Sequence, residues 1–455
     1  MPRKNAPRNV GSGWEEGPIG PGDIHPTIQF ICARLAEHGH EVLIVGGAVR
    51  DLLLGQRPKD FDLATSARPE EVKRLFRNAR IIGRRFRLVL LRYPDMTVEV
   101  STFRGEAPKR AGDMIRRDNR YGTWGEDAFR RDFTINAMAF DPTTGKVLDP
   151  VKGQADLEAR RLKTIKPPLE SFTEDPVRML RAVRFQVRLG FEIAPACQKA
   201  IRGEGRMLEK VSRHRLADEL QRFLTHKQAP GLLNALAGNG LLNPLLNLKP
   251  HDWFFAPAAV KDPLSALEPL LVRFSRWEEH LSEPPSPTVA LTALVLTLAT
   301  ERHRAWLLGP GEAPREVLGP FRNRLGTLMA QWGFLNGQVG PTLAIVNAAH
   351  AILAEPERFT DPREPGPFLL GIREAWLLLN ALRDVISVPQ ALLDAGLSQL
   401  GNLPDLPILD HPRPVNRGEQ PTPAARRHGV SGDGPPFGPK RKRRRRSGRR
   451  QSPPD

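Results

Sequence analysis

Short apolar segments of β type are confined to one part of the chain, and this confinement constrains the fold more than any other feature. Between about residues 24 and 150, the pattern predicts strands over residues 41–45, 61–64, 87–92 and 97–103. Helices are predicted over residues 27–38, 49–54 and 69–76. From Phe172 onward the β-signals fade. We therefore expect an α+β unit of about 130 residues, followed by a helical region.

The helical region is predicted from apolar periodic segments that Gly and Pro separate. These segments are residues 176–189, 215–224, 229–241, 265–280, 288–301, 322–332, 341–353 and 375–386. Proline becomes dense after about residue 400, where order should fail. We expect a flexible segment (residues 1–22), an α+β head (23–150), a helical neck (151–245), a helical body (246–402) and a disordered basic tail (403–455).

The charge of the chain is unevenly distributed. The formal net charge is +17, and nine positive charges lie in KRKRRRRSGRR, residues 440–450, so the rest carries about +8 (17 − 9). A segment this basic indicates a polyanionic partner such as nucleic acid. The alternative is a solvated tail with no specific partner. The first interpretation predicts RNA-binding residues in the tail: Lys440, Arg441, Lys442, Arg443 and Arg444.

Cysteine usage and hydropathy indicate a cytoplasmic protein. Cys32 and Cys197 are far apart and have no partners at metal-binding spacing, which argues against a disulfide framework or a zinc site. Residues 1–22 lack the apolar core of a signal peptide. The longest apolar stretch, residues 289–299, is too short to span a bilayer and is typical of a buried helix.

A strand, two glycines and a helix follow one another in LIVGGAVRDLLLG, residues 43–55. Paired glycines allow the backbone to approach a phosphate, and the N–H groups at a helix start favour negative charge. Arg50 could donate to a triphosphate. A plain tight turn is the alternative at Gly46 and Gly47. Neither the dinucleotide fingerprint nor the P-loop spacing is met.

Candidate metal ligands follow in KDFDLAT, residues 59–65. Asp60 and Asp62 are two residues apart, so on a strand both carboxylates face the same side. Such a pair repels unless a cation lies between them, and Mg²⁺ prefers oxygen ligands. In TVEVSTFRG, Glu99 alternates with valines and could complete the site, or it could simply face solvent. Arg104, just past this strand, could contact phosphate or base.

Two further charged segments could contact a nucleotide. In RRDFTINAMAFDP, residues 130–142, Arg131 and Asp132 could contact sugar or phosphate, or Asp132 could cap a helix. In EDPVRMLRAVRF, residues 174–185, Asp175 suits the N-cap of a helix. Arg178 and the arginines that follow it at intervals of three form a basic stripe. The structural account is a capped amphipathic helix; the functional one is that Asp175 and Arg178 recognise the edge of a nucleobase.

In this order, the five segments resemble the class II nucleotidyltransferases of the polymerase β superfamily, which include bacterial poly(A) polymerases and CCA-adding enzymes. The resemblance covers roughly residues 42–241. It implies a polymerase β-like head, then a helical neck and body. It also implies a triphosphate-binding motif at Gly46, Gly47 and Arg50. The metal-binding carboxylates would be Asp60, Asp62 and Glu99.

The same resemblance implies how the nucleotide is recognised and what reaction follows. Arg131, Asp132 and Asn136 match the segment implicated in ribose recognition, and Asp175 with Arg178 matches the pair that reads the incoming base without a template. The RNA 3′-hydroxyl would attack the α-phosphorus of ATP and release pyrophosphate, assisted by two Mg²⁺ ions.

The segment IIGRRFRL, residues 81–88, is similar to the version found in poly(A) polymerases, whereas CCA-adding relatives tend to carry His-Gly there. The basic tail is similar to those of bacterial poly(A) polymerases too. The resemblance therefore implies addition of adenylates to RNA 3′ ends. The alternatives are addition of CCA, or part of it, to tRNA, and an inactive RNA-binding protein.

Overall fold

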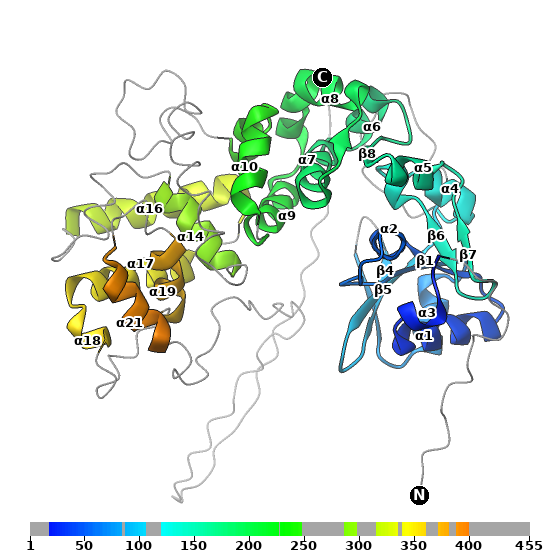
Figure 1. The fold of residues 1–455 in the computed structure, drawn as a ribbon, viewed down its shortest axis with the longest axis horizontal. Coiled ribbons are helices and arrows are strands. Elements are labelled where there is room, and N and C mark those ends of the chain that lie inside the picture. Colours follow the sequence, from blue (N-terminus) through cyan, green and yellow to red (C-terminus); the bar gives the residue numbers. More distant parts are fainter. Residues whose placement is uncertain are drawn as a thin grey trace, which may run out of the picture. The chain divides into compact units, whose positions relative to one another are not determined.

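The head is built on one mixed sheet (Figure 1). The computed structural model describes residues 18–83, 87–105, 120–226, 228–247, 286–297, 315–334, 339–360, 372–381 and 388–399. Seven strands have the spatial order β3-β4-β5-β2-β1-β6-β7. Their bounds are β1 Val42–Val45, β2 Asp62–Thr65, β3 Ala79–Ile82, β4 Leu88–Arg92, β5 Thr97–Thr102, β6 Ala139–Asp141 and β7 Lys146–Leu148. The α+β head is thus confirmed, and it contains three strands that the apolar pattern did not predict: β3, β6 and β7.

The register of the central strands decides which side chains share a face. β2 and β5 run parallel with Asp62 opposite Glu99, whereas β1 and β2 run antiparallel with Val45 opposite Asp62. Because side chains alternate along a strand, Asp62 and Glu99 project from one face and their valine and leucine neighbours from the other. Burial follows this alternation around Glu99, which is exposed between buried Val98 and Val100, whereas in β2 only Asp62 is exposed.

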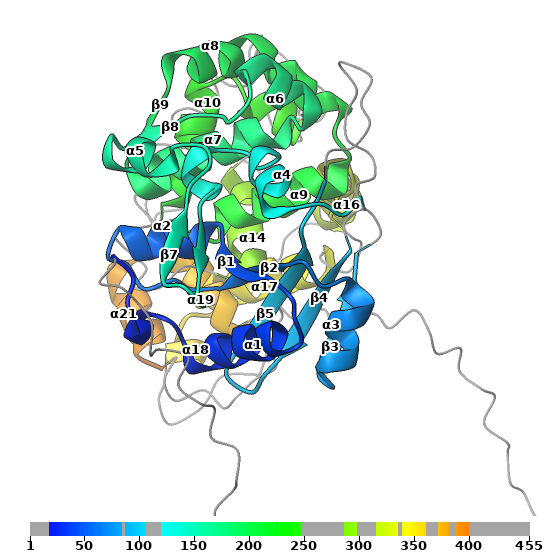
Figure 2. The ribbon, with the colours of Figure 1, turned by 90° about the vertical axis from the view of Figure 1, so that its right-hand side faces the viewer.

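Two clusters of apolar side chains cover the two faces of the sheet. The larger cluster packs strand residues such as Leu63 and Val98 against the helices α1 (Pro26–Glu37) and α3 (Pro69–Leu75), which run along one side of the sheet in Figure 2. A smaller cluster on the other face packs Val45 and Ala64 against Trp124 of α4 (Trp124–Phe129). The carboxylate face is therefore only partly covered, which leaves room for a site.

The neck is mainly helical. Its helices are α5 Gly153–Glu158, α6 Pro168–Glu174, α7 Val177–Leu189, α8 Pro195–Glu204, η3 Gly205–Lys210, α9 Arg213–Leu224, α10 Ala229–Gly238 and α11 Leu242–Leu246. One difference from the expected all-helical neck is a short parallel pair, β8 (Arg161–Leu162) with β9 (Glu192–Ile193). These strands pair residues about thirty positions apart, and two-residue strands leave no periodic signal in the sequence.

The body is helical wherever the structure describes it. It contains α14 Pro287–Thr297, α16 Arg315–Trp332, α17 Val339–Ala354, α18 Glu357–Thr360, α19 Ile372–Ala381 and α21 Gln390–Gln399. No helix among the described residues is long and apolar enough to cross a membrane. The predicted helix over residues 265–280 and the predicted tail, with its RNA-binding candidates, lie outside the described residues.

The N-terminal boundary of the head lies earlier than the predicted segment 1–22 suggests. The side chain of Ile19 is 2% exposed and belongs to the larger apolar cluster. A 3₁₀ turn, η1 (Pro21–Asp23), then precedes α1. Residues 1–17 lie outside the described residues.

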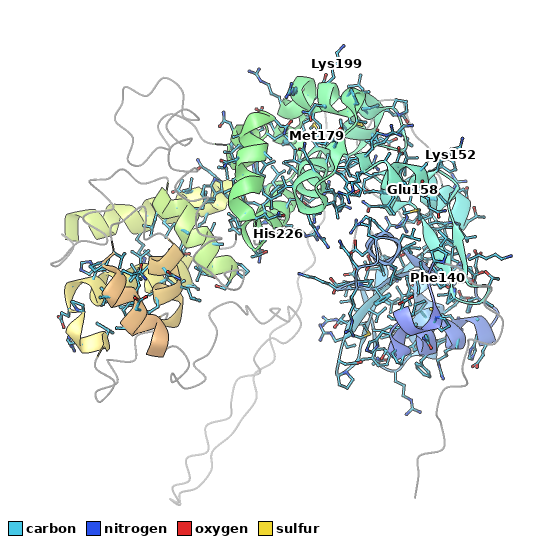
Figure 3. All side chains as sticks on the ribbon, in the orientation of Figure 1. Phe140, Lys152, Glu158, Met179, Lys199 and His226 are labelled. Atoms are coloured by element: carbon cyan, nitrogen blue, oxygen red, sulfur yellow. The ribbon has the colours of Figure 1, made fainter. Side chains whose placement is uncertain are left out.

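Figure 3 labels side chains from the interior and from the surface of the head and neck. Phe140 on β6 and Met179 on α7 are fully buried, whereas Lys152 and Lys199 are exposed. Both cysteines, Cys32 and Cys197, are buried and free.

We predict that Gly153→Ala destabilises the fold. A Cβ built on Gly153 at the start of α5 would lie 2.3 Å from the Thr134 carbonyl oxygen, so the backbone must move. Overpacking of this kind costs about 1–3 kcal/mol, which chemical denaturation would measure. Gly203→Ala on α8 is the matched control, because nothing lies within 4 Å of its Cβ. It should stabilise by up to about 1 kcal/mol, and equal effects of both substitutions would contradict the steric explanation.

Candidate active site

One pocket of about 720 Å³ brings together residues from the head sheet and from the neck helices α7 and α9. All twelve predicted site residues that the structure describes line it: the three carboxylates and the nine nucleotide-binding candidates. They come from five separate sequence segments, so the fold itself assembles them. Their individual roles remain predictions.

The acidic side of the pocket is formed by Asp60, Asp62 and Glu99. Asp62 and Glu99 are register partners on adjacent parallel strands, and Asp60 lies just before β2. Partial burial, together with repulsion from Glu99 and Asp60, raises the pKa of Asp62 from 3.8 to about 6, although Arg131 and Arg181 oppose this shift. A bound cation would relieve the repulsion.

These carboxylates fit a hard divalent cation by their chemistry. Oxygen donors that face a polar pocket suit Mg²⁺. Among the residues that the structure describes, no set of three or more His, Cys, Asp or Glu side chains forms a preassembled metal site.

The predicted phosphate-binding turn adopts a conformation that requires glycine. Gly46 has φ +73°, and a Cβ built on it would lie 3.3 Å from Nη1 of Arg131. Arg131 is held by Asp127, to which its Nη2 donates at 2.9 Å, and its guanidinium lies 5.2 Å from the ring centroid of Trp124. The turn and a fixed guanidinium group thus lie side by side at the end of β1.

Arg50 is not a free donor in this structure. Its Nε and Nη2 donate to Asp51 at 2.8 and 2.6 Å, and its Nη1 donates to Asn136 at 2.6 Å. Asn136 in turn donates to Asp132 at 3.2 Å, and Arg181 donates to Asp132 at 2.7 Å. Arg50 is 2% exposed, so these residues form a buried chain of contacts from α2 (Gly47–Leu53) through η2 (Thr134–Asn136) to α7.

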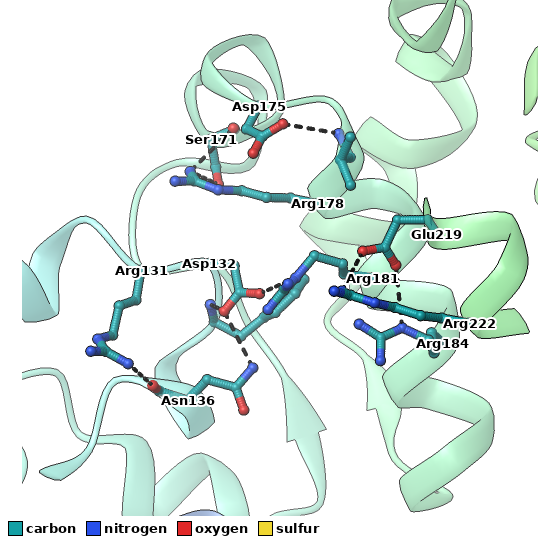
Figure 4. Close-up of polar contacts among 12 residues, drawn as sticks. Arg131, Asp132, Asn136, Ser171, Asp175, Arg178, Arg181, Arg184, Glu219 and Arg222 are labelled. Atoms are coloured by element: carbon teal, nitrogen blue, oxygen red, sulfur yellow. Dashed lines mark hydrogen bonds and ion pairs between the residues drawn. The ribbon is translucent and has the colours of Figure 1, made fainter. Parts of the chain in front are cut away.

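The charge of Asp132 is stabilised by this chain. Burial would raise its pKa, but the charges of Arg181 and Arg178 outweigh burial and lower it. The backbone N–H of Phe133 also donates to Asp132 at 2.8 Å. The capping alternative is wrong, because Phe133 is the N-cap of η2 and no side chain caps this turn. Asp132 instead binds Arg181 of α7 (Figure 4).

The base-recognition candidates lie at the start of α7, and each has protein partners. Asp175 accepts from Arg215 of α9 at 2.8 Å and from the backbone N–H of Val177 at 3.4 Å. Arg178 donates to the hydroxyl of Ser171 and to the carbonyl oxygen of Arg130, both at 2.9 Å. The N-cap role predicted for Asp175 and its position in the pocket are thus compatible.

Several pocket residues were not singled out from the sequence. They are Asp127, Arg188, Arg215, Asp218, Glu219 and Arg222. Arg188 lies four residues after Arg184, on the same side of α7 as the predicted basic stripe. Extending that stripe by one helical turn would have included it. The residues on α9 belong to no motif, and only the packing of α9 against α7 brings them into the site.

Known protein families match the chain in two separate segments, one mainly in the head and one mainly in the neck. Residues 42–163 match the family model of the poly A polymerase head domain. Residues 190–251 match the model described as a probable RNA and SrmB-binding site of polymerase A. Over these segments the chain is similar to the class II nucleotidyltransferases. The family resemblance seen in the motifs is therefore confirmed.

Relatives of two kinds fall in this family. Poly(A) polymerase I of Haemophilus influenzae is 38% identical over 237 residues, which are 50% of this chain and 52% of the relative. The CCA-adding enzyme of Bacillus pumilus is 36% identical over 219 residues, 48% of this chain and 54% of the relative. The chain thus spans about half the length of the curated relatives that it matches.

Among solved structures, the CCA-adding enzyme of Bacillus stearothermophilus in complex with CTP is similar over most of the chain. It is 26% identical, with a TM-score of 0.58, and covers 82% of this chain and 81% of its own. The similarity extends beyond residue 251, where the family models end. The similarity to that structure therefore includes part of the helical region that follows the neck.

We predict that Asp62→Asn removes a pH-dependent destabilisation. Since the pKa of Asp62 is raised to about 6, the folded protein binds this proton more tightly than the unfolded chain. The free energy of unfolding of the wild type should therefore fall as pH rises from about 4 to 6, relative to the variant. Water in the pocket screens Asp62, so we expect a difference of about 1 kcal/mol at pH 7.

Urea denaturation of both proteins in EDTA at pH 4 and pH 7 checks this prediction. The stabilising effect of Asp62→Asn should be present at pH 7 and small at pH 4. An equal effect at both pH values would indicate altered packing instead of relieved repulsion.

Proposed function

We propose that this protein is an enzyme that adds nucleotides to the 3′ end of RNA without a template. The observation that carries the proposal is the pocket itself, where the carboxylates of β2 and β5 face the same space as Asp175 and Arg178. Similarity to the nucleotidyltransferase family and the match to an RNA-binding model support it. The nucleotide would lie between the two walls.

In the proposed reaction, Asp60, Asp62 and Glu99 hold two Mg²⁺ ions. When bound, Mg²⁺ lowers the pKa of the RNA 3′-hydroxyl and neutralises charge on the phosphates. Gly46 and Gly47 leave backbone surface open to the triphosphate, and Arg131 supplies a fixed positive charge beside it. The hydroxyl oxygen forms a bond to the α-phosphorus and loses its proton to solvent, while the bond from the α-phosphorus to the pyrophosphate oxygen breaks.

Asp175 and Arg178 are proposed to select the base. A carboxylate accepts and a guanidinium donates, so together they fit the hydrogen-bonding edge of a nucleobase. Ser171 and the Arg130 carbonyl hold Arg178, and Arg215 holds Asp175, so the pair is oriented before a nucleotide arrives. Preorganised donors and acceptors of this kind discriminate between bases.

We propose ATP as the substrate and adenylate addition as the activity. The relatives named poly(A) polymerase I, at 38–41% identity, support this, as do residues 83–86 and the basic tail. The second candidate is addition of CCA to tRNA. The observation that favours it is the similarity of the fold to a CCA-adding enzyme over 82% of the chain.

Extension of two labelled RNAs tests the proposal and separates the candidates. With ATP alone, a poly(A) polymerase should extend an unstructured oligomer into a long ladder. A CCA-adding enzyme should instead extend a tRNA that lacks CCA by a fixed number of residues and should require CTP. No extension of either RNA would leave the inactive RNA-binding protein as the remaining interpretation.

We predict that Asp60→Ala and Asp62→Ala each reduce transfer by more than about 100-fold, since even outer-shell partners of a catalytic metal contribute about 10- to 100-fold. RNA affinity, measured by fluorescence anisotropy, should be retained. Glu37→Ala on α1 is the matched control, because Glu37 is an exposed acid that does not line the pocket. Loss of RNA binding with intact transfer would refute the assignment.

We predict that removing residues 440–455 weakens RNA binding and its salt dependence, because the segment carries nine positive charges. Each phosphate contact on a single strand contributes about 0.7 to the slope of log affinity against log salt. Titrations at several salt concentrations measure the slope. Replacing the nine basic residues with Gln keeps the length and should have the same effect; an unchanged slope contradicts the prediction.

A further inference from the structure

The wall of the pocket opposite the carboxylates carries more positive than negative charge. Glu219 of α9 contacts two arginines: Arg222 Nη1 at 3.0 Å and Arg184 Nε at 3.4 Å. Asp51 is likewise shared, with Arg50 Nη2 at 2.6 Å and Arg188 Nη2 at 3.6 Å. Each group of two arginines and one acid has a net charge of +1.

The Arg184–Glu219 contact is incomplete. Nε of Arg184 and Oε2 of Glu219 are both buried, and neither has a hydrogen-bond partner among the described residues, although they lie 3.4 Å apart. Burial lowers the pKa of Arg184 to about 10; Glu219 opposes this, and the charges of Arg181 and Arg222 add to it. Figure 4 shows Arg184 and Arg222 reaching Glu219 from two different helices. An anion at this wall would relieve the repulsion between them.

The positive wall continues towards the carboxylates. Arg184 and Arg188 line the same pocket as Asp60, Asp62 and Glu99. Burial lowers the pKa of His226, just after α9, and the charges of Arg188, Lys59 and Arg184 lower it further. Lys59 immediately precedes Asp60 in the chain. A strand bound along this wall would therefore lead to the acidic side of the pocket.

We propose that Arg184, Arg188 and Arg222 bind a phosphodiester of the RNA acceptor strand, close to its 3′ end. The inference rests on the proposed function, because the acceptor hydroxyl must approach the carboxylates. Guanidinium groups donate to phosphate oxygens with charge-assisted hydrogen bonds. The other possible source of the same chemistry is the triphosphate of the nucleotide, whose predicted site is the turn at Gly46 and Gly47 beside Arg131.

Arg222→Ala is the variant that tests the subsite. Its side chain is 56% exposed, and Arg184 remains to contact Glu219, so the fold should be retained. Arg202→Ala on α8 removes the same charge from an exposed position that does not line the pocket. The full-length protein and a labelled oligoadenylate are used, without nucleotide and in EDTA, so that binding is measured without transfer.

We expect Arg222→Ala to weaken RNA binding about tenfold, the effect of one charge-assisted contact, and to reduce the salt slope by about 0.7. Arg202→Ala should change neither. A neutral methylphosphonate at one linkage near the 3′ end should weaken binding to the wild type equally and should not weaken binding to Arg222→Ala further. The KM for ATP should stay within about twofold.

Two outcomes would contradict the proposal that these arginines bind an RNA phosphodiester. An unchanged RNA affinity with a raised KM for ATP would assign the wall to the triphosphate. Equal losses in Arg222→Ala and Arg202→Ala would indicate diffuse charge attraction without a site. The wild type could instead fail to extend RNA and still bind the methylphosphonate RNA more weakly than the unmodified RNA. In that case the proposed function is wrong and the phosphate subsite is supported.

Discussion

The pocket depends on one buried chain of polar contacts, in which Arg50 binds Asn136, Asn136 binds Asp132, and Asp132 binds Arg181. A buried charge without partners costs several kcal/mol. The three segments that supply these groups therefore have to meet in one arrangement. That arrangement brings α7 against the head, where Arg181 binds Asp132 and the Arg50 guanidinium lies over the Phe185 ring, and α9 then packs against α7. Both walls of the pocket, the one with the carboxylates and the one with the arginines of α7 and α9, depend on this arrangement.

Much of the site could be predicted because its residues lie in short sequence segments with recognisable spacing. The alternation around Glu99 predicted that its carboxylate points away from the neighbouring valines, and Glu99 is exposed opposite Asp62 in the sheet. Asp60 lies before β2 instead of on it, and it lines the same pocket. The partners of each charged group were not predictable. Arg50 was expected to face a phosphate, yet it bonds to Asn136, 86 residues away. Local spacing carries no information on such contacts, since tertiary packing sets them.

The fold shows the same division between local and distant information. Long periodic helices such as α7 and α17 were predicted within two residues of their ends, because a 3.6-residue period repeats several times in each. The short strands β6, β8 and β9 were not predicted. Each has two or three residues, and each is stabilised by pairing with a strand elsewhere in the chain. A period of two cannot be recognised in so short a segment.

The acidic wall of the pocket carries Asp62 and Glu99, and the backbone pairing of β2 with β5 fixes where these two residues lie. Ladder hydrogen bonds fix the spacing of Asp62 and Glu99, and most substitutions in neighbouring side chains leave those bonds intact. The basic wall, in contrast, is held by side chains that bind side chains, so a single substitution can rearrange it. Substitutions on α7 and α9 can therefore change the basic wall while the register of β2 and β5 keeps the carboxylates in place.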